Sequence, residues 1–167
     1  MQQLIKMRAF VILLGIAFVI LDQWVKVEAV TSLQLNSSRL GGSFAWLDIA
    51  LSLNPGAFLS LGAELAPAIK QVIFITGVGV VVCWAIGWSL FNWTAARVKA
   101  MGVYCIALGG LSNLIDRLAR DEHVVDYLVL NFGRLHSGVF NIAYMAIMVG
   151  AVVLALNVTK SSSRTQK

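Results

Sequence analysis

Charged residues, prolines, cysteines and histidines are all scarce in this sequence. Charged side chains make up only 13% of the 167 residues, and there are 2 prolines, 2 cysteines and 2 histidines. So little charge excludes a water-soluble domain of this length. Cys83 and Cys105 fall inside apolar segments, where a thiol behaves as a small hydrophobic group, so we expect no disulfide. His123 and His136 have no cysteine or histidine at ligand spacing, so we expect neither a metal nor another cofactor.

Apolar side chains are correspondingly abundant. They make up 59% of the chain, and the mean hydropathy is +0.81. Four segments approach the roughly 20 apolar residues that a helix needs to cross about 30 Å of hydrocarbon. We therefore predict an all-α membrane protein with four transmembrane helices, at residues 9–25, 70–92, 99–116 and 138–158. The first segment has no small-residue cleavage site, so we expect it to remain as an anchor.

Basic residues give the expected orientation of these helices. The flanking segments 1–8, 92–99 and 159–167 contain lysines and arginines but no acid. By the positive-inside rule these segments are cytoplasmic, so the topology is N-in/C-in. Because these flanks carry most of the basic residues, the net charge of +5 does not indicate a nucleic-acid partner. One membrane domain covers residues 1–160, and residues 161–167 are predicted to be a disordered basic tail.

The longer connections lie on the external face in this topology. Residues 28–69 contain Gly41-Gly42, Pro55-Gly56 and Pro67 as helix breakers, and the middle of this segment mixes aromatic with small residues. We predict a small β-rich segment there, lying on the membrane surface. Residues 117–137 are predicted to be a second external loop, which folds back against the helix ends.

Two groups of polar residues lie at the end of the third predicted helix and shortly after it. Asn113, Asp116 and Arg117 come within about one turn after a glycine pair, and polar groups at that depth need partners. The alternative is an ordinary helix end whose charges flank the bilayer. Asp126 has apolar neighbours, so desolvation would raise its pKa into a range that suits proton transfer. The alternative for Asp126 is a surface acid.

Three other short motifs lie near the same face. Asn141 and Tyr144 are one turn apart at the head of the fourth predicted helix, on one face of it. Asp22 and Lys26 form an i, i+4 pair at the external end of the first, where an interfacial anchor would need no further function. Asn54-Pro55-Gly56 is typical of a turn.

Taken in this order and on this topology, the motifs resemble lipoprotein signal peptidase, the signal peptidase II family of bacterial membrane aspartic proteases. The resemblance covers nearly the whole chain. Its residues are Asp22-Gln23 with Lys26, Asn54 with Gly56-Ala57-Phe58, Gly109, Asn113-Leu114-Ile115-Asp116-Arg117, Val125-Asp126-Tyr127 and Phe140-Asn141-Ile142-Ala143. Each motif is short, but five of them in register with four spans form a strong joint signal.

The resemblance implies an aspartic endopeptidase of the bacterial cytoplasmic (inner) membrane, with its active site facing the periplasm or exterior. Such an enzyme cleaves the signal peptide of a diacylglyceryl-modified prolipoprotein just before the lipidated cysteine. Its expected partners are that precursor and membrane phospholipid. Two aspartates would carry the reaction. One corresponds to Asp126, and the other ends the F-N-x-A-D motif, where this chain has Tyr144.

The resemblance also assigns supporting roles. Residues that would contact the substrate or orient Asp126 are Asn54, Asn113, Arg117 and Asn141. Residues that would support the site are Gly56, Asp22, Lys26 and Asp116.

Tyr144 is the main departure from the family pattern. Two adjacent carboxyl groups share a proton, so that one acts as a base on water and the other as an acid. A phenol, with an ordinary pKa near 10, is neutral at physiological pH and donates a hydrogen bond instead. Losing one member of a catalytic unit typically costs several orders of magnitude in rate. We therefore expect little or no peptidase activity.

Two functional hypotheses follow. In the first, the chain is a family enzyme that Tyr144 inactivates. In the second, it is a catalytically silent relative that binds a lipoprotein, a lipid or another membrane protein subunit as a scaffold. A transporter or channel gains no support, because the predicted spans have no charges that would line a path.

Overall fold

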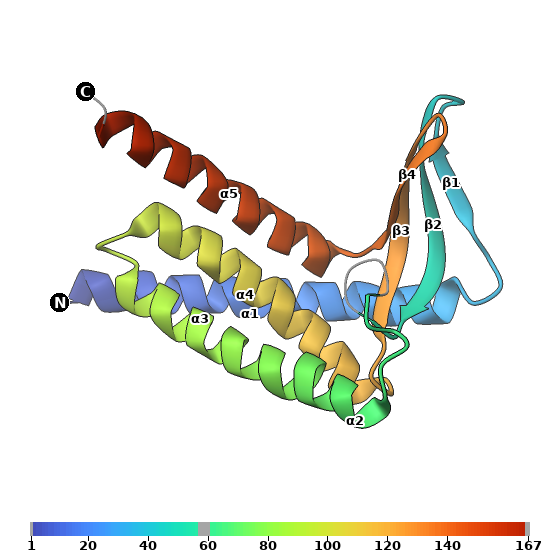
Figure 1. Ribbon diagram of the computed structural model, residues 1–167, viewed down its shortest axis with the longest axis horizontal. Helices are drawn as coiled ribbons and strands as arrows, with labels where there is room; N and C mark the ends of the chain where they lie inside the picture. The colour runs from blue at the N-terminus through green and yellow to red at the C-terminus, as the bar shows by residue number, and fades with distance from the viewer. Residues whose placement is uncertain (1, 57–60, 166–167) are drawn as a thin grey trace.

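Long apolar helices form a bundle, and an antiparallel sheet lies at one end of it (Figure 1). The structure, a computed structural model, describes residues 2–56 and 61–165, with side chains as far as Val158. The helical elements are α1 (Gln2–Ser32), α2 (Pro67–Lys70), the π-helical segment η2 (Gln71–Gly77), α3 (Val78–Asn92), α4 (Arg97–Ala119) and α5 (Ile142–Thr165). The strands are β1 (Ser38–Gly41), β2 (Ala45–Asn54), β3 (Val124–Phe132) and β4 (Leu135–Phe140).

Among the described residues, three helical stretches are long and apolar enough to cross a membrane. They are α1, the continuous run Pro67–Asn92 through α2, η2 and α3, and α4. The apolar part of α5, Ile142–Val158, is shorter. All four apolar segments of the sequence are therefore helical, and three of them have the length of a span.

The helices begin and end at different residues from those predicted. α1 continues past residue 25 to Ser32, because its charged outer part contains no proline or glycine that would end it. α5 begins only at Ile142, since residues 138–140 belong to β4. At its other end α5 continues to Thr165, through the first five residues of the predicted disordered tail, where no proline or glycine interrupts it.

The sheet is larger than predicted and draws on both external segments. Its order is β1-β2-β3-β4, and all neighbours are antiparallel. Residues 117–137, predicted to be a loop, instead provide β3 and part of β4. The run from Val124 to Phe132 is rich in valine and aromatic residues, which favour strands once a partner strand is present. That partner, β2, comes from the segment predicted to be β-rich.

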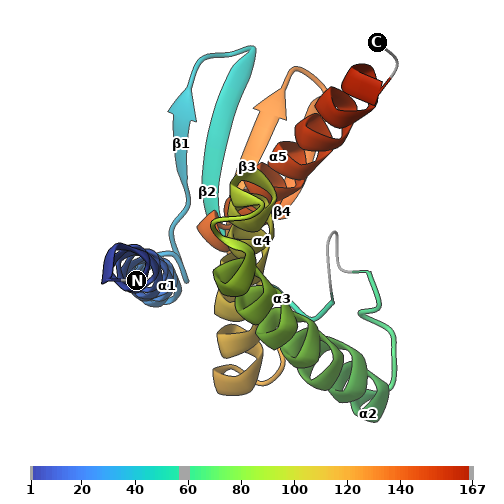
Figure 2. The same ribbon diagram turned by 90° about the vertical axis from the view of Figure 1, so that its left-hand side faces the viewer.

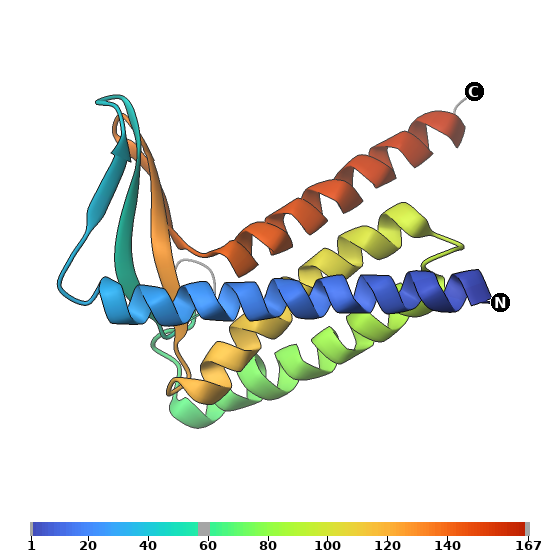
Figure 3. The same cartoon turned by 180° about the vertical axis from the view of Figure 1, so that it is seen from behind.

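Glycines let α4 and α5 pack closely. A Cβ atom on Gly109 would overlap the carbonyl oxygen of Ala143 in α5. Gly102 and Gly150 likewise face each other across the two helices, backbone against backbone. Small residues at helix contacts are typical of membrane proteins, where close backbone packing replaces the hydrophobic effect. The contact at Gly109 fixes the head of α5 beside the half of α4 that is nearer the sheet. Away from it, α5 leans away from α1 (Figure 3).

Candidate active site

Asp126 is held between two asparagines that come from different parts of the chain. It lies on β3 and is only 3% exposed. Asn54, at the end of β2, donates from Nδ2 to Asp126 Oδ2 at 3.0 Å. Asn141, just before α5, donates from Nδ2 to Asp126 Oδ1 at 2.7 Å. Each carboxylate oxygen therefore has a side-chain donor that fixes its direction.

Asn141 also begins α5. Its Oδ1 accepts the backbone N–H of Tyr144 at 2.7 Å, which is the bond an N-cap residue makes to the third residue of a helix. Its Nδ2 additionally lies 3.1 Å from the Val125 carbonyl oxygen and 3.2 Å from Asn113 Oδ1. One buried amide thus ties the start of α5 to β3 and to α4.

Behind these residues lies a buried ion cluster centred on Lys26. Its Nζ lies 2.9 Å from Asp22 Oδ2, 2.9 Å from Asp116 Oδ2 and 2.9 Å from Asn113 Oδ1. An ammonium group has three N–H donors, so each donor has a partner. Lys26, Asp22 and Asp116 are all 0% exposed. Buried charges at this depth are stable only when paired and hydrogen-bonded, as they are here.

Asp22 connects this cluster to the head of α5. Its Oδ1 accepts the backbone N–H of Ala143 at 3.0 Å, and its Oδ2 accepts the hydroxyl of Ser112 at 2.6 Å. The first N–H groups of a helix have no partner inside the helix, and a carboxylate there also interacts favourably with the helix dipole. Asp22 on α1 therefore caps α5 from a neighbouring helix.

Both carboxylate oxygens of Asp116 also accept hydrogen bonds from several donors. Its Oδ2 accepts from Lys26 and from the Val125 N–H at 3.0 Å. Its Oδ1 accepts from Gln23 Nε2 at 2.8 Å and from the guanidinium of Arg120. The cluster pairs two carboxylates with two cations, so it is neutral as a whole.

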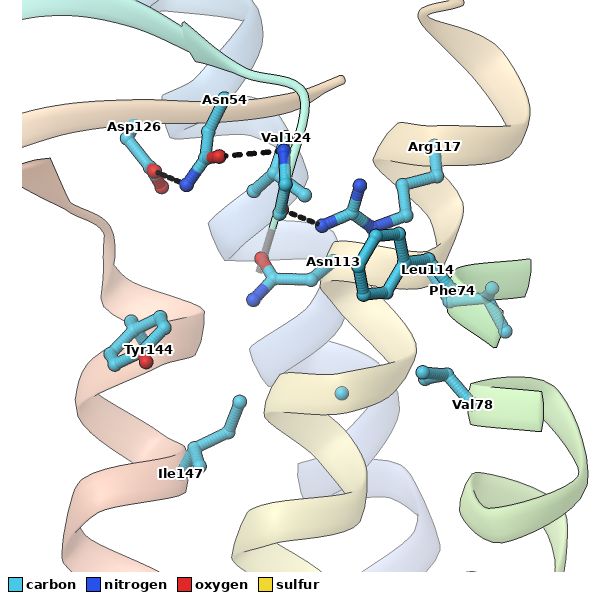
Figure 4. A pocket seen from close by; sticks show the side chains of 12 residues that line it. Asn54, Phe74, Val78, Asn113, Leu114, Arg117, Val124, Asp126, Tyr144 and Ile147 are labelled. Atoms are coloured by element: carbon cyan, nitrogen blue, oxygen red, sulfur yellow. Dashed lines mark hydrogen bonds between the residues drawn. The ribbon is translucent and has the colours of Figure 1, made fainter. Parts of the chain in front are cut away.

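A cavity of about 280 Å³ opens beside Asp126. Figure 4 shows Asp126, Asn113 and Tyr144 around this space, with Arg117 on the α4 side. Arg117 donates to the Gly56 carbonyl oxygen and, at 2.9 Å, to the Glu122 carbonyl oxygen, so it holds the end of β2 against the end of α4. The remaining walls, from η2, α3, α4 and α5, are mainly apolar. They include Phe74, Val78, Gly110, Leu114 and Ile147.

Burial raises the pKa of Asp126 to about 6. Desolvation is the largest cause, and the hydrogen bond from Asn54 opposes it. A carboxyl group with this pKa exchanges its proton near neutral pH, which suits a general acid or base. The sequence predicted this shift from the apolar neighbours of Asp126.

The predicted site residues come together in two layers. Asn54, Gly56, Asn113, Arg117, Asp126 and Tyr144 line the cavity. Asn141, Asp22, Lys26 and Asp116 lie behind it and hold its walls, as the contacts above show. Ala57 and Phe58 of the predicted motif lie outside the described residues. Asp116 and Arg117 are adjacent in sequence, but Arg117 lines the cavity, whereas Asp116 lies behind it.

Sequence reasoning missed several residues of the site. Gln23 belongs to the Asp22-Gln23 motif, but no role for it followed from the sequence. In the structure its amide nitrogen donates to both Ser112 and Asp116. Arg120 gave no signal, because a basic residue at a helix end has an ordinary explanation as a flanking charge. The apolar wall residues, such as Phe74, could not be separated by sequence from residues that face lipid.

The comparisons with known proteins identify the family. The family model described as "Signal peptidase (SPase) II" matches residues 14–160. The chain belongs to the signal peptidase II family. Among its relatives is the lipoprotein signal peptidase of Cupriavidus taiwanensis, 38% identical over 149 residues, which cover 87% of this chain and 82% of the relative. Another is that of Neisseria meningitidis, 32% identical over 155 residues and 92% of each chain.

Solved structures agree with this fold. A bacterial membrane enzyme superimposes with a TM-score of 0.77 at 23% identity, over 93% of this chain and 91% of that one. A second structure, also of a bacterial membrane enzyme, has a TM-score of 0.75 and covers 90% of this chain. The relatives therefore show the family, and the solved structures agree with a mostly helical fold that carries a small antiparallel sheet.

The buried cluster makes a prediction about stability. Replacing Lys26 by methionine keeps most of the side-chain volume but leaves two buried carboxylates without their shared cation. Breaking a buried ion pair from one side typically costs about 3–5 kcal/mol. We expect Lys26→Met to lower the melting temperature of the protein in detergent strongly. Lys99→Met, at an exposed lysine near the start of α4, is the control and should melt like the unaltered chain. Equal melting of the two variants would contradict a supporting role for Lys26.

The raised pKa of Asp126 leads us to expect that the free energy of unfolding depends on pH. Its folded-state value of about 6 lies above the ordinary 3.8. The protonated group therefore favours the folded state fully below about pH 4, and this contribution is lost as the pH rises through about 6. Relative to Asp126→Asn, which cannot titrate, the unaltered chain should lose up to about 3 kcal/mol of unfolding free energy between about pH 4 and pH 7. Denaturation of both proteins at the two pH values measures this, and a constant difference would contradict the raised pKa.

Proposed function

We propose that this chain binds diacylglyceryl-modified prolipoproteins in the cavity beside Asp126 and cleaves them very slowly, because Tyr144 stands where the family has its second catalytic aspartate. One observation carries the proposal. Asp126 and Tyr144 line the same cavity, and no other carboxyl group among the described residues lines it. Membership of the signal peptidase II family supports the choice of substrate.

The chemistry explains the reduced rate. Peptide hydrolysis by two carboxyl groups needs one ionised group to take a proton from water and one protonated group to give a proton to the scissile amide. Asp126 is able to fill one of these roles. A phenol at position 144 would donate a hydrogen bond to the substrate carbonyl oxygen, but it would not take over a base role at neutral pH. With a phenol at position 144, the site has no second carboxyl group that could act as the base while Asp126 acts as the acid, or the reverse.

The remaining buried acids do not replace the missing group. Asp22 and Asp116 face Lys26. Their oxygens also accept from one backbone N–H each and from the side chains of Ser112, Gln23 and Arg120. Moving either into the cavity would break its buried ion pair with Lys26 and leave its other donors without their acceptor, at a cost of several kcal/mol. Neither residue lines the cavity.

The surroundings of the cavity suit a lipid-modified peptide in a membrane. Phe74, Val78 and Ile147 offer an apolar wall toward the helices, whereas Asn54, Asn113 and Arg117 offer polar groups toward the sheet. A substrate that is apolar at its lipid and polar along its backbone matches this division. We place the chain in the bacterial inner membrane with four spans, both termini in the cytoplasm and the site on the outer face. The acid-free basic flanks support this orientation.

Restoring the aspartate tests the proposal. We expect Tyr144→Asp to raise the cleavage rate of a purified diacylglyceryl-modified precursor by on the order of 10³-fold or more, since it returns the missing member of a catalytic unit. Tyr144→Asn is the matched control, because it creates the same space without an acid and should stay slow. Combining Tyr144→Asp with Asp126→Asn should remove the gain.

Two results would overturn this function. Cleavage by the unaltered chain at the rate of Tyr144→Asp would mean that Tyr144 does not limit the reaction. A folded Tyr144→Asp variant that binds the precursor but does not cleave it would favour a silent, scaffold-like relative. Separating the two requires a binding measurement on each variant beside the cleavage assay.

A further inference from the structure

A groove of about 820 Å³ lies along α1, α4 and α5, and it shares no lining residue with the cavity beside Asp126. Figure 2, seen from the end where the N-terminus lies, shows α1 and α5 on either side of α4. The volume of the groove is within the roughly 300–1,000 Å³ that is typical of ligand pockets. The bundle therefore has a second hollow, which the proposed hydrolysis does not use.

Close packing of α1 against α4 forms the floor of this groove. Tyr104 of α4 donates from its hydroxyl to the Val11 carbonyl oxygen at 3.2 Å, and a Cβ atom on Gly15 would overlap that hydroxyl. α5 leans away from α1, so the groove lies open between these two helices (Figure 3). The way the helices pack therefore creates the groove.

The groove is about as long as one leaflet of a bilayer is deep. On α1 its lining residues run from Met7 to Phe18, which is about 16 Å of helix. Half of a hydrocarbon core of about 30 Å has nearly the same depth. Among the described residues that line the groove, Arg97 is the one with a charge. An acyl chain of one leaflet matches both the length and the apolar lining.

Arg97 begins α4 at the end of the bundle that lies away from the sheet (Figure 1). Its Nη2 lies 3.8 Å from Met7 Sδ, and a thioether is a weak acceptor. Arg97 has no ion-pair partner within the described part of the chain, since residues 1–8 and 92–99 at this end contain no acid. An exposed guanidinium group of this kind is suited to bidentate hydrogen bonds with a phosphate.

Charge decides between a lipid and another helix as the occupant of the groove. Lys6, Arg8 and Lys99 lie on the same two segments as Met7 and Arg97, so this end of the bundle is strongly basic. The signal peptide of a precursor begins with a positively charged region, and a second copy of this chain in the same orientation would bring the same basic flanks. Both would be repelled. The phosphate of an anionic phospholipid is attracted instead, as in other basic pockets between membrane helices.

We propose that the groove is a binding site for an anionic phospholipid, whose phosphate meets Arg97 and whose acyl chain lies between α1 and α5. In the orientation proposed above, this lipid belongs to the inner leaflet. The other end of the groove reaches Ile142 and Met145 at the head of α5. The acyl chain therefore supports the helix that begins after Asn141. The inference rests on membrane insertion and does not depend on Tyr144 or on cleavage.

Lipid binding to the purified protein tests the role of Arg97. Native mass spectrometry from detergent measures the binding of dioleoyl phosphatidylglycerol, and zwitterionic dioleoyl phosphatidylcholine is the comparison. We expect phosphatidylglycerol to bind more tightly, and Arg97→Gln to weaken its binding about fivefold, because one basic residue at a lipid surface contributes about this much. Lys99→Gln is the matched control, since Lys99 is exposed on the same segment but does not line the groove. It should bind phosphatidylglycerol like the unaltered chain.

A second pair of variants tests where the acyl chain lies. Val149 lines the groove and is 56% exposed, so Val149→Trp takes up space for the chain without disturbing buried residues. Val152, on the same helix and 52% exposed, does not line the groove, and Val152→Trp is the control. We expect Val149→Trp to lose most of the bound phosphatidylglycerol and Val152→Trp to lose none.

Several results would overturn the lipid site. Equal binding of the two lipids, unchanged in Arg97→Gln, would mean that lipid covers the helices without selection. Full displacement by glycerol phosphate, which has no acyl chain, would mean a site for free anions. Equal loss in the two tryptophan variants would place the lipid elsewhere, and a dimer without bound lipid would mean that a second copy covers the groove. The readout is lipid binding, so this proposal and the proposed function fail separately.

Discussion

The ammonium group of Lys26 is the contact on which the rest of the structure depends. It meets Asp22 of its own helix and both Asp116 and Asn113 of α4, each at 2.9 Å. In a membrane, helices are not driven together by the hydrophobic effect, so packing and polar contacts between them decide which helices meet. Asp22 also accepts the Ala143 N–H, so the same cluster holds the start of α5. These contacts join three helices at the end of the bundle that lies beside the sheet.

The candidate site is built on this frame. Asn141 begins α5 and at the same time orients Asp126, so the direction of the carboxyl group depends on where the helix starts. Tyr144 is the residue whose N–H Asn141 caps. Its position in the cavity is therefore fixed by the same contact that would position an aspartate. In the proposed function, an aspartate in place of Tyr144 would change the chemistry of this arrangement without changing the frame.

The sequence could predict the helices and most of the residues that line the cavity or lie behind it. A bilayer requires about 20 apolar residues per span, and that requirement is visible in a single sequence. The polar residues of the site stand out because polar groups are rare in such segments. The sheet could not be predicted in the same way. Asn54 and Asp126 are 72 residues apart, and nothing local reveals that their strands pair.

The errors have the same origin. β4 ends inside an apolar run that continues directly into α5, and an apolar run of this kind is compatible with strand or helix. The segment before it was predicted to be a loop because its polar beginning hides the strand Val124–Phe132. Arg120 reaches Asp116 because α4 continues beyond its predicted end at residue 116 to Ala119, which hydropathy alone does not indicate.

The most direct measurement is a stoichiometric incubation of the unaltered chain with a purified diacylglyceryl-modified precursor in lipid nanodiscs. Affinity recovery of the chain after several hours gives the bound fraction, and mass spectrometry reports whether the bound precursor is whole. We predict that it is recovered bound and uncut. Free signal peptide and processed lipoprotein appearing within minutes would contradict the central claim that one carboxyl group beside a phenol does not sustain this hydrolysis.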